Sequence, residues 1–260
     1  MPARVQRIEP HFVERVWGSF DLQPLFEPRE RRIGEVWFDA GPLLIKFLFT
    51  TEALSVQVHP DDAYAQAHEG SAGKTEMWHI LRAEPHARIA LGFQEPVSLE
   101  QALRAAEEGT IEGLLGWYEA RAEDTYLTPA RTVHALGAGL VVCEIQQTSD
   151  VTYRLYDYGR RRELHLDKGF AVADLGSHPG KSQPEPLTGG VERLASCEYF
   201  VTERWEVSVR APWPGGILIA IEGSGELDGQ HFGAGEVWIV DNGVELKPEG
   251  RLVVLRTYEP

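Results

Sequence analysis

Three short segments of the chain carry side chains of the kinds that bind divalent metal ions. Gln57 and His59 are two residues apart in an alternating segment, so on a strand both side chains point to the same face. Glu76 follows in a second segment and His134 in a third. Two imidazoles, a carboxylate and an amide oxygen that converge inside a β-barrel would suit a divalent cation. Imidazole favours zinc, whereas the oxygen ligands are also compatible with manganese or iron.

Each of these side chains also has an ordinary structural interpretation. A strand histidine more often makes a hydrogen bond than a metal bond, and glutamine is an uncommon metal ligand. The alternation over Val56, Gln57, Val58 and His59 separates apolar from polar side chains. If the polar face points into a barrel, its groups need partners, and a metal ion would supply them. If it faces solvent, no metal is needed, and the alternation leaves both arrangements open.

Strands are the elements that must position these side chains. The chain has 26 glycines, 16 prolines and few stretches of helical periodicity, which favours a β-rich fold. We expect strands within residues 33–59, followed by a turn or a helix start at 60–62. Further strands are expected over residues 125–127, 140–146, 151–156 and 164–166.

One segment has a clear helical signal. Residues 98–101, Ser-Leu-Glu-Gln, form a capping box, and Gly109 is a stop signal. The face expected to pack consists of Leu99, Ala102, Leu103 and Ala106. A second short helix is expected over residues 110–115.

The second half of the chain has a different composition. Residues 177–190 are rich in proline, glycine and serine, which is typical of a linker. Beyond them, strand-like segments recur at the spacing of a β-sandwich, over residues 197–201, 205–209, 217–221, 236–240 and 252–256. We therefore predict a mainly β protein of two jelly-roll β-sandwich domains, with a small helical insertion near residues 98–116 of the first. The expected boundaries are 1–180 for the first domain, 181–190 for the linker and 191–260 for the second.

The whole-chain charge limits the partners. In 260 residues, 40 acidic side chains against 25 basic ones give a formal net charge of −15, so nucleic acid and anionic membranes are poor partners. The most apolar stretch, residues 43–49, is too short for a membrane span and contains Lys46. The first residues lack the apolar core of a signal peptide, so a cytoplasmic location is expected. Nothing in the sequence specifies an oligomeric state.

Nine motifs in residues 14–170 occur in the order of one enzyme family. They are WG (17–18), GEVW (34–37), KFL (46–48), QVHPDD (57–62), GKTEMW (73–78), TVHA (132–135), EIQQTSDVTYR (144–154), LYDYGR (155–160) and RELH (162–165). On these motifs the chain resembles the type I phosphomannose isomerases (mannose-6-phosphate isomerases) of the cupin superfamily. Residues 190–260 resemble the second, metal-free cupin domain of that family only in a general way.

The resemblance implies a set of site residues. It implies one Zn²⁺ per chain, with Gln57, His59, Glu76 and His134 as ligands, the same residues that the strand-face argument selects. It also implies Lys74 and Arg154 beside the sugar phosphate and the reacting carbons, with Asp150 as an acidic neighbour. The segment from Arg154 to Lys168 carries a local charge of +2, five basic against three acidic residues, and adds Arg160 as an expected substrate contact.

The implied activity is a zinc-dependent conversion between mannose 6-phosphate and fructose 6-phosphate through a cis-enediol, catalysed by Lys74, Arg154 and Asp150. The partner is thus a small sugar phosphate. The developing enediolate oxygen needs stabilisation, which a metal ion and a nearby cation can provide. Asp150, Glu144 and His79 are all candidates for the general base. The alternative function is a non-catalytic, metal-containing cupin that binds a sugar or sugar phosphate as a sensor.

The chain departs from the family pattern at two places, and two of the candidate residues also have a purely structural interpretation. Arg131 stands where the family usually has glycine, so backbone strain is expected there if the position needs a positive φ. The segment between Trp37 and Lys46 is short, as if a loop or subdomain had been trimmed. Asp150 and Arg154 share a strand face and would then pair with each other. His165 is expected to make a structural hydrogen bond.

Overall fold

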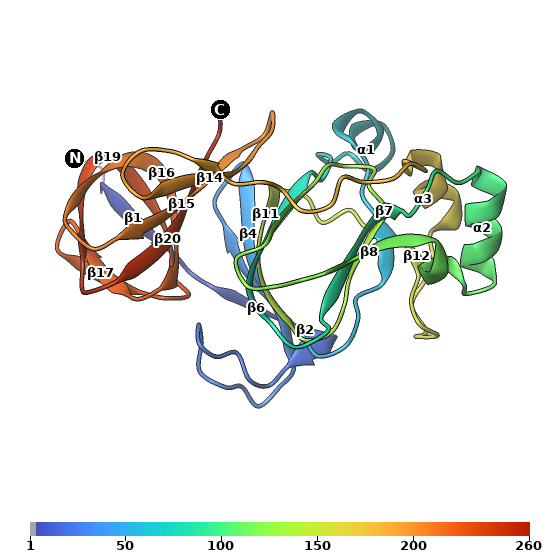
Figure 1. The fold of residues 1–260 in the computed structure, drawn as a ribbon, viewed down its shortest axis with the longest axis horizontal. Coiled ribbons are helices and arrows are strands. Elements are labelled where there is room, and N and C mark those ends of the chain that lie inside the picture. Colours follow the sequence, from blue (N-terminus) through green and yellow to red (C-terminus); the bar gives the residue numbers. More distant parts are fainter. Residues whose placement is uncertain (1–3) are drawn as a thin grey trace.

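The computed structural model describes residues 4–260 and consists of two lobes side by side. A nine-stranded antiparallel sheet, the C-terminal lobe, lies on the left of Figure 1. Two further sheets and the helices, the first lobe, lie on the right, with the helices at its far side. The expected mainly β fold with a small helical insertion is confirmed.

The first lobe contains a six-stranded and a five-stranded antiparallel sheet. In spatial order the six-stranded sheet consists of β2 (His11–Ser19), β3 (Ile33–Asp39), β4 (Leu43–Thr50), β11 (Leu140–Gln147), β6 (Glu76–Ala83) and β9 (Thr125–Thr128). The five-stranded sheet consists of β12 (Tyr153–Tyr156), β5 (Val56–Val58), β10 (His134–Leu136), β7 (Arg88–Phe93) and β8 (Leu115–Glu119). The strands expected within 33–59 and at 125–127 and 140–146 are therefore present.

The C-terminal lobe is one antiparallel sheet that also takes up the first strand of the chain. Its spatial order is β13 (Glu185–Pro186), β14 (Val191–Ser196), β15 (Val201–Val207), β20 (Leu252–Tyr258), β16 (Ala211–Glu222), β19 (Val237–Pro248), β17 (Ser224–Leu227) and β18 (Gln230–Gly233). Strand β1 (Val5–Ile8) pairs with β19. Residues 5–8 thus add a strand to the C-terminal lobe, and β13 lies within the segment expected to be a linker. The division of the chain at 181–190 stays a prediction.

The helices lie on the outer side and at the upper end of the first lobe in Figure 1. They are α1 (Asp62–Glu69), α2 (Leu99–Glu107), the 3₁₀ helix η1 (Ile111–Leu114) and α3 (Leu166–Val172). Ser98 caps α2 by accepting a hydrogen bond from the backbone N–H of Gln101, as the capping box predicts. Asp61 caps α1 in the same way through Tyr64. None of the helices within residues 4–260 is long and apolar enough to cross a bilayer.

Strand β4 is buried along its whole length because its two faces have different neighbours. Ile45 and Phe47 belong to a core that continues into the C-terminal lobe through Ile219 and Leu255. Full burial of a phenylalanine side chain such as that of Phe47 stabilises the fold by about 1.5–3 kcal/mol. The alternate residues of β4 therefore point to the other side, into the space between the two sheets of the first lobe.

The five-stranded sheet decides which way the candidate ligands point. Val56 and Val58 belong to a core with Ala102 of α2 and Phe170 of α3. Because side chains alternate along a strand, Gln57 points away from the helices, toward the interior between the sheets. The question that the alternation leaves open is thus answered: the polar face of this segment points inward.

Three sequence-based expectations about elements are wrong. Residues 164–166 form no strand, since α3 begins at Leu166 and packs so closely that a Cβ on Gly169 would lie 2.5 Å from Leu155. Residues 197–200 form a turn between β14 and β15, closed by a hydrogen bond from the N–H of Cys197 to the carbonyl of Phe200. On α2 the buried face is made by three alanines, whereas Leu99 is 51% exposed. Small side chains let that helix approach the sheet closely.

Candidate metal centre and substrate cleft

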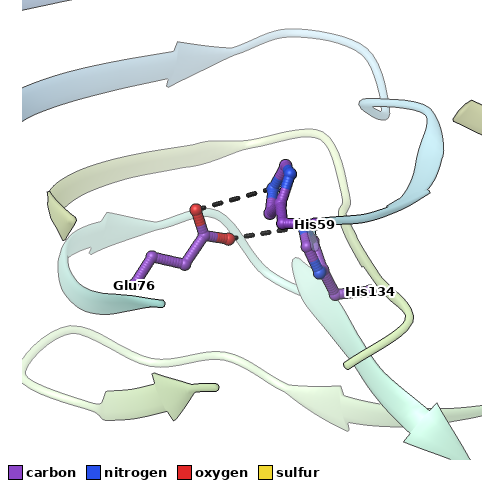
Figure 2. Close-up of side chains that lie close together, drawn as sticks. All are labelled: His59, Glu76 and His134. Atoms are coloured by element: carbon purple, nitrogen blue, oxygen red, sulfur yellow. Dashed lines mark ion pairs between the residues drawn. The ribbon is translucent and has the colours of Figure 1, made fainter. Parts of the chain in front are cut away.

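Two histidines and a glutamate from both sheets of the first lobe meet in its interior. His59 directly follows β5, His134 begins β10, and Glu76 reaches across from the start of β6 (Figure 2). Glu76 Oε1 lies 3.3 Å from His134 Nε2, and its Oε2 lies 3.7 Å from His59 Nε2. Each of the three residues is 1% exposed. Gln57 faces His134 across the β5–β10 ladder, with its amide nitrogen 3.3 Å from His134 Nε2.

Both histidines are held in the form that binds metal. The Nδ1 of His59 is 2.8 Å from the carbonyl oxygen of Val151, and that of His134 is 2.8 Å from the carbonyl of Thr132. Each Nδ1 therefore carries the proton and donates it, which leaves the Nε2 lone pair free to face Glu76. Burial lowers the pKa of His134 to about 4 and that of His59 well below its ordinary value, so both rings are neutral.

The donor atoms are close enough together to share one metal ion, since all three lie within 4.8 Å of one another. Ligands about 2.0–2.2 Å from zinc are about 3.3–3.6 Å from one another. The 3.3 Å between Glu76 Oε1 and His134 Nε2 equals such a separation, and the 3.7 Å between the other carboxylate oxygen and His59 Nε2 is slightly longer. Neutral imidazoles and a carboxylate are also the chemical donors that zinc prefers. This buried His-Glu-His group can hold a divalent metal ion.

Two buried lysines and a second buried glutamate surround the group. Lys74 Nζ lies 3.0 Å from both His59 Nε2 and Glu76 Oε2. Lys46 Nζ lies 3.1 Å from Glu144 Oε1. Two ammonium groups thus face two carboxylates, which leaves the cluster neutral when all four are ionised.

The same cluster sets the protonation of its members. Burial raises the pKa of Glu76 to about 7 against the opposing influence of Lys74. Burial alone would raise the pKa of Glu144, but Lys46 and Lys74 lower it. Burial alone would lower the pKa of Lys74, but Glu76 and Glu144 raise it, so its side chain is a firmly charged ammonium.

A cleft of about 620 Å³ opens beside the group. Its volume lies within the range of about 300–1,000 Å³ that is typical of small-molecule sites. The charged and polar side chains that line it are Glu14, Arg15, Glu35, Lys46, Ser55, Gln57, Lys74, Glu144, Asp150, Thr152, Arg154, Arg162 and His165. The expected residues Gln57, Lys74, Asp150 and Arg154 thus line one cleft.

Arg154 and Asp150 lie in the cleft without forming the expected pair. Arg154 is opposite Gln57 on the β12–β5 ladder, so both side chains are on the sheet face that carries His134. Within residues 4–260, no ion pair or side-chain hydrogen bond involves the Arg154 guanidinium or the Asp150 carboxylate. Burial, followed by the charge of Arg162, lowers the pKa of Arg154 below its ordinary value. An arginine in this position has all its donors available for a ligand.

Comparison with known proteins identifies the family. The chain is 35% identical over 256 residues to the mannose-6-phosphate isomerase ManA of Bacillus subtilis (strain 168), covering 90% of this chain and 80% of that protein. The chain belongs to the mannose-6-phosphate isomerase family. The probable mannose-6-phosphate isomerase GmuF of the same organism is 33% identical over 256 residues, covering 80% of this chain and 81% of that protein. No family model matches the chain.

The fold is also that of a solved member of this enzyme family. The crystal structure of the mannose 6-phosphate isomerase from Bacillus subtilis superposes with a TM-score of 0.88 at 27% identity, covering 98% of this chain and all of that one. The resemblance inferred from the motifs is thus confirmed.

Two residues considered at the sequence level lie outside the cleft. Arg160 does not line it, because its guanidinium contacts Asp157, Glu52 and the carbonyl oxygen of Ala53. His79, one candidate base, hydrogen-bonds Thr125 at 2.9 Å and lines a different cavity of about 220 Å³.

Sequence reasoning assigned no role to Lys46, Arg15 and Arg162, all of which line the cleft. For Lys46 the signal is its position in the apolar run 43–49, since a lysine in a strand buried on both faces must meet a carboxylate inside the protein. Arg15 and Arg162 carry no such signal, because Arg162 is the last of three consecutive arginines and Arg15 lies in a strand that is mostly exposed or half-buried.

Both departures from the family pattern have a structural counterpart. Arg131 has φ +75°, so this non-glycine residue is strained as expected, and its N–H donates to the carbonyl oxygen of His59 at 2.7 Å. The short segment after Trp37 is a tight turn between β3 and β4, in which the N–H of Ala40 donates to the carbonyl of Leu43. His165 makes the expected structural hydrogen bond, accepting from the N–H of Arg154 at 3.2 Å.

Proposed function

We propose that this protein is a zinc-dependent isomerase that interconverts mannose 6-phosphate and fructose 6-phosphate through a cis-enediol. The observation that carries the proposal is the buried His-Glu-His group at a cleft lined by Lys74 and Arg154, in a chain of this family. The family supplies the substrate, and the donor set supplies the choice of metal.

The proposed zinc ligands are His59, Glu76, His134 and Gln57, the last through its amide oxygen. That oxygen now accepts a hydrogen bond from Ser55 at 3.2 Å, and the oxygen and nitrogen of an amide exchange places by a half-turn. Bound zinc supplies Lewis-acid polarisation of a substrate oxygen. Lys74 must give up its contact with His59 Nε2 in that state, because one lone pair cannot serve both cations.

Charge balance supports an anionic substrate. Lys46 and Lys74 cancel Glu76 and Glu144, so a divalent ion leaves the floor of the cleft with two positive charges. A phosphate monoester carries a charge of about −1.5 to −2 at neutral pH. The whole-chain charge of −15 therefore does not oppose binding of this substrate, since the sign is reversed locally.

The remaining roles follow from which groups are available. Lys74 is the ammonium best placed to share the charge that develops on the enediolate oxygen, because it lies beside Glu76. Arg154, with no protein partner in the described chain, can hold an oxyanion with two parallel donors. We assign the proton transfer between the two carbons to Asp150, because Glu144 is engaged by Lys46 and Trp78.

The test is a coupled assay of fructose 6-phosphate formation from mannose 6-phosphate, before and after chelation. We expect chelation to abolish turnover and zinc to restore it. No turnover by the zinc-loaded protein would overturn the proposal, and binding of mannose 6-phosphate without turnover would favour the sensor function. Restoration by manganese or iron but not by zinc would overturn the metal assignment.

A second measurement addresses the enediol. In D₂O, a base that carries the proton between carbons exchanges part of it with solvent, so deuterium is expected in the product. Complete retention of the substrate hydrogen would instead indicate hydride transfer.

A further inference from the structure

Arg160 and Arg162, two of the three consecutive arginines after Gly159, share one carboxylate partner but have different surroundings. Asp157, whose side chain is 1% exposed, accepts hydrogen bonds from Arg162 at 2.7 Å and 2.6 Å and from Arg160 at 3.2 Å. One buried carboxylate thus orients two guanidinium groups. Tyr158 and Gly159 both have positive φ, +55° and +75°, and this turn sends the two side chains in different directions.

Only one of the two guanidinium groups lies on the cleft with an amine that has no partner among the described residues. The second amine of Arg160 donates to Glu52 at 3.1 Å and to the carbonyl oxygen of Ala53 at 2.8 Å, away from the cleft. Arg162 binds Asp157 through Nε and one amine, and among the described residues its other amine has no partner. Arg162 also lines the cleft, whereas Arg160 does not. A guanidinium fixed on one side by a buried carboxylate is preorganised to bind an anion with the other.

Two further donors face the same cleft. His165 Nδ1 accepts from the N–H of Arg154, so the proton of the neutral ring is on Nε2. Burial and the charge of Arg154 lower the pKa of His165, which keeps the ring neutral and a donor. Arg15 binds Glu35 through Nε and one amine, at 3.2 Å and 2.9 Å, and its other amine donates to the carbonyl oxygen of Glu14 at 3.3 Å, so a carboxylate orients it as Asp157 orients Arg162.

We propose that Arg162, with His165 and Arg15, binds the phosphate group of the substrate, and that Arg160 does not. The inference rests on the proposed function and names the residues of its phosphate subsite. The carboxylates closest to these groups are paired, Glu35 with Arg15, Glu14 with Arg31 and Asp157 with two arginines. Among the described residues that line the cleft, Asp150 is a carboxylate without an ion-pair partner. The subsite therefore keeps a positive charge, in addition to that of the unpartnered Arg154.

A matched pair of variants separates this role from a structural one. Arg162→Gln and Arg160→Gln each remove one arginine from Asp157, with two hydrogen bonds in the first variant and one in the second, so both variants disturb this carboxylate and its loop. We expect Arg162→Gln to raise KM for mannose 6-phosphate by about 10- to 100-fold more than Arg160→Gln does, since a charge-assisted hydrogen bond contributes that much binding. Arg162→Lys keeps the charge without the fork and is expected to lie between wild type and Arg162→Gln.

Inorganic phosphate provides a readout that does not depend on turnover. We expect its dissociation constant, measured by calorimetry on the metal-loaded protein, to rise in Arg162→Gln and in His165→Asn but much less in Arg160→Gln. Equal effects of Arg160→Gln and Arg162→Gln on phosphate binding would overturn the inference, whether or not the protein is an isomerase. Wild-type protein that binds phosphate but converts no mannose 6-phosphate would overturn the proposed function and leave the subsite standing.

Discussion

The two lobes of this protein are both built from antiparallel strands, but they fill their interiors differently. In residues 191–260, Glu203 is the one charged residue that is buried. In the first lobe the buried charged residues are Glu35, Lys46, Lys74, Glu76, Glu144 and Asp157, and all but Asp157 lie in or beside the cleft. Burying a charge costs free energy even when it is paired, and an apolar pair of similar volume is often as stable. The contrast points to the first lobe as the functional one. The interior of the C-terminal lobe is almost entirely apolar, which favours stability, whereas the first lobe buries charged side chains at a cost in stability.

The largest effect is expected from a substitution that removes a buried charge at the metal centre. Glu76→Gln keeps the shape of the side chain but removes the negative charge that faces both histidines. We expect the zinc content to fall below one ion per chain and kcat/KM to fall by about 1,000-fold, since metal catalysis supplies several kcal/mol. Metal analysis and the coupled assay check this. A variant with full zinc and full activity would show that Glu76 is not a ligand.

A glutamate-to-glutamine substitution in the C-terminal lobe is expected to lower stability and leave the zinc content unchanged. Glu203 pairs with Arg256 at 3.1 Å and accepts a hydrogen bond from Trp205 at 3.0 Å. Glu203→Gln leaves Arg256 uncompensated, so we expect the free energy of unfolding to drop by about 3–5 kcal/mol with zinc content unchanged. Denaturant titration and metal analysis measure the two quantities. Loss of zinc in this variant would mean that the lobes are not functionally separate.

A histidine near the boundary between the lobes gives a dependence on pH. Burial lowers the pKa of His79 to about 4, whereas an unfolded chain has its ordinary value of 6.5. The unfolded state therefore binds the extra proton between these values, so the contribution of His79 is fully present above pH 6.5 and is lost as the pH falls toward 4.

In metal-free protein we expect wild type to lose up to about 3 kcal/mol more than His79→Gln between pH 7 and pH 4. His59 and His134 titrate in both proteins, so their effect cancels in the difference. Unfolding titrations at several pH values provide the measurement. Parallel pH profiles for the two proteins would show that His79 does not contribute.

The ease of prediction from sequence also differs between regions. Period-two alternation placed Gln57 and His59 on one face, residue types added Glu76 and His134 as further candidate ligands, and the family motifs imply the same four residues. These signals are local, since a strand fixes side-chain direction by itself. Strand alternation could not predict where the Arg160 side chain points. Its orientation depends on two preceding residues with positive φ and on the buried carboxylate of Asp157.

Elements beyond the motifs were harder to predict for a related reason. The prediction of a strand over residues 164–166 is wrong because the alternation of Leu164 and Leu166 with His165 runs into helix α3, and only the close packing of that helix on Leu155 reveals its buried face. Strand β1 pairs with β19, more than 200 residues away, and no local pattern encodes such a partner. Sequence reasoning thus succeeded where side chains are placed by their own strand and failed where a distant segment places them.

The smallest expected effect concerns Arg131, whose backbone supports the metal centre through His59. With φ +75°, this residue has a conformation that favours glycine, yet its side chain donates to the carbonyl oxygen of Val172 at 2.9 Å. Arg131→Gly relieves the strain, but it loses this hydrogen bond and increases the conformational entropy of the unfolded chain. These effects oppose one another, so we expect the free energy of unfolding to change by less than about 1 kcal/mol. Arg131→Val keeps a side chain that tolerates positive φ poorly, and we expect a loss of about 1–3 kcal/mol. Thermal unfolding of the two variants compares them directly. If valine were tolerated as well as glycine, strain at this position would not be what distinguishes this chain from its family pattern.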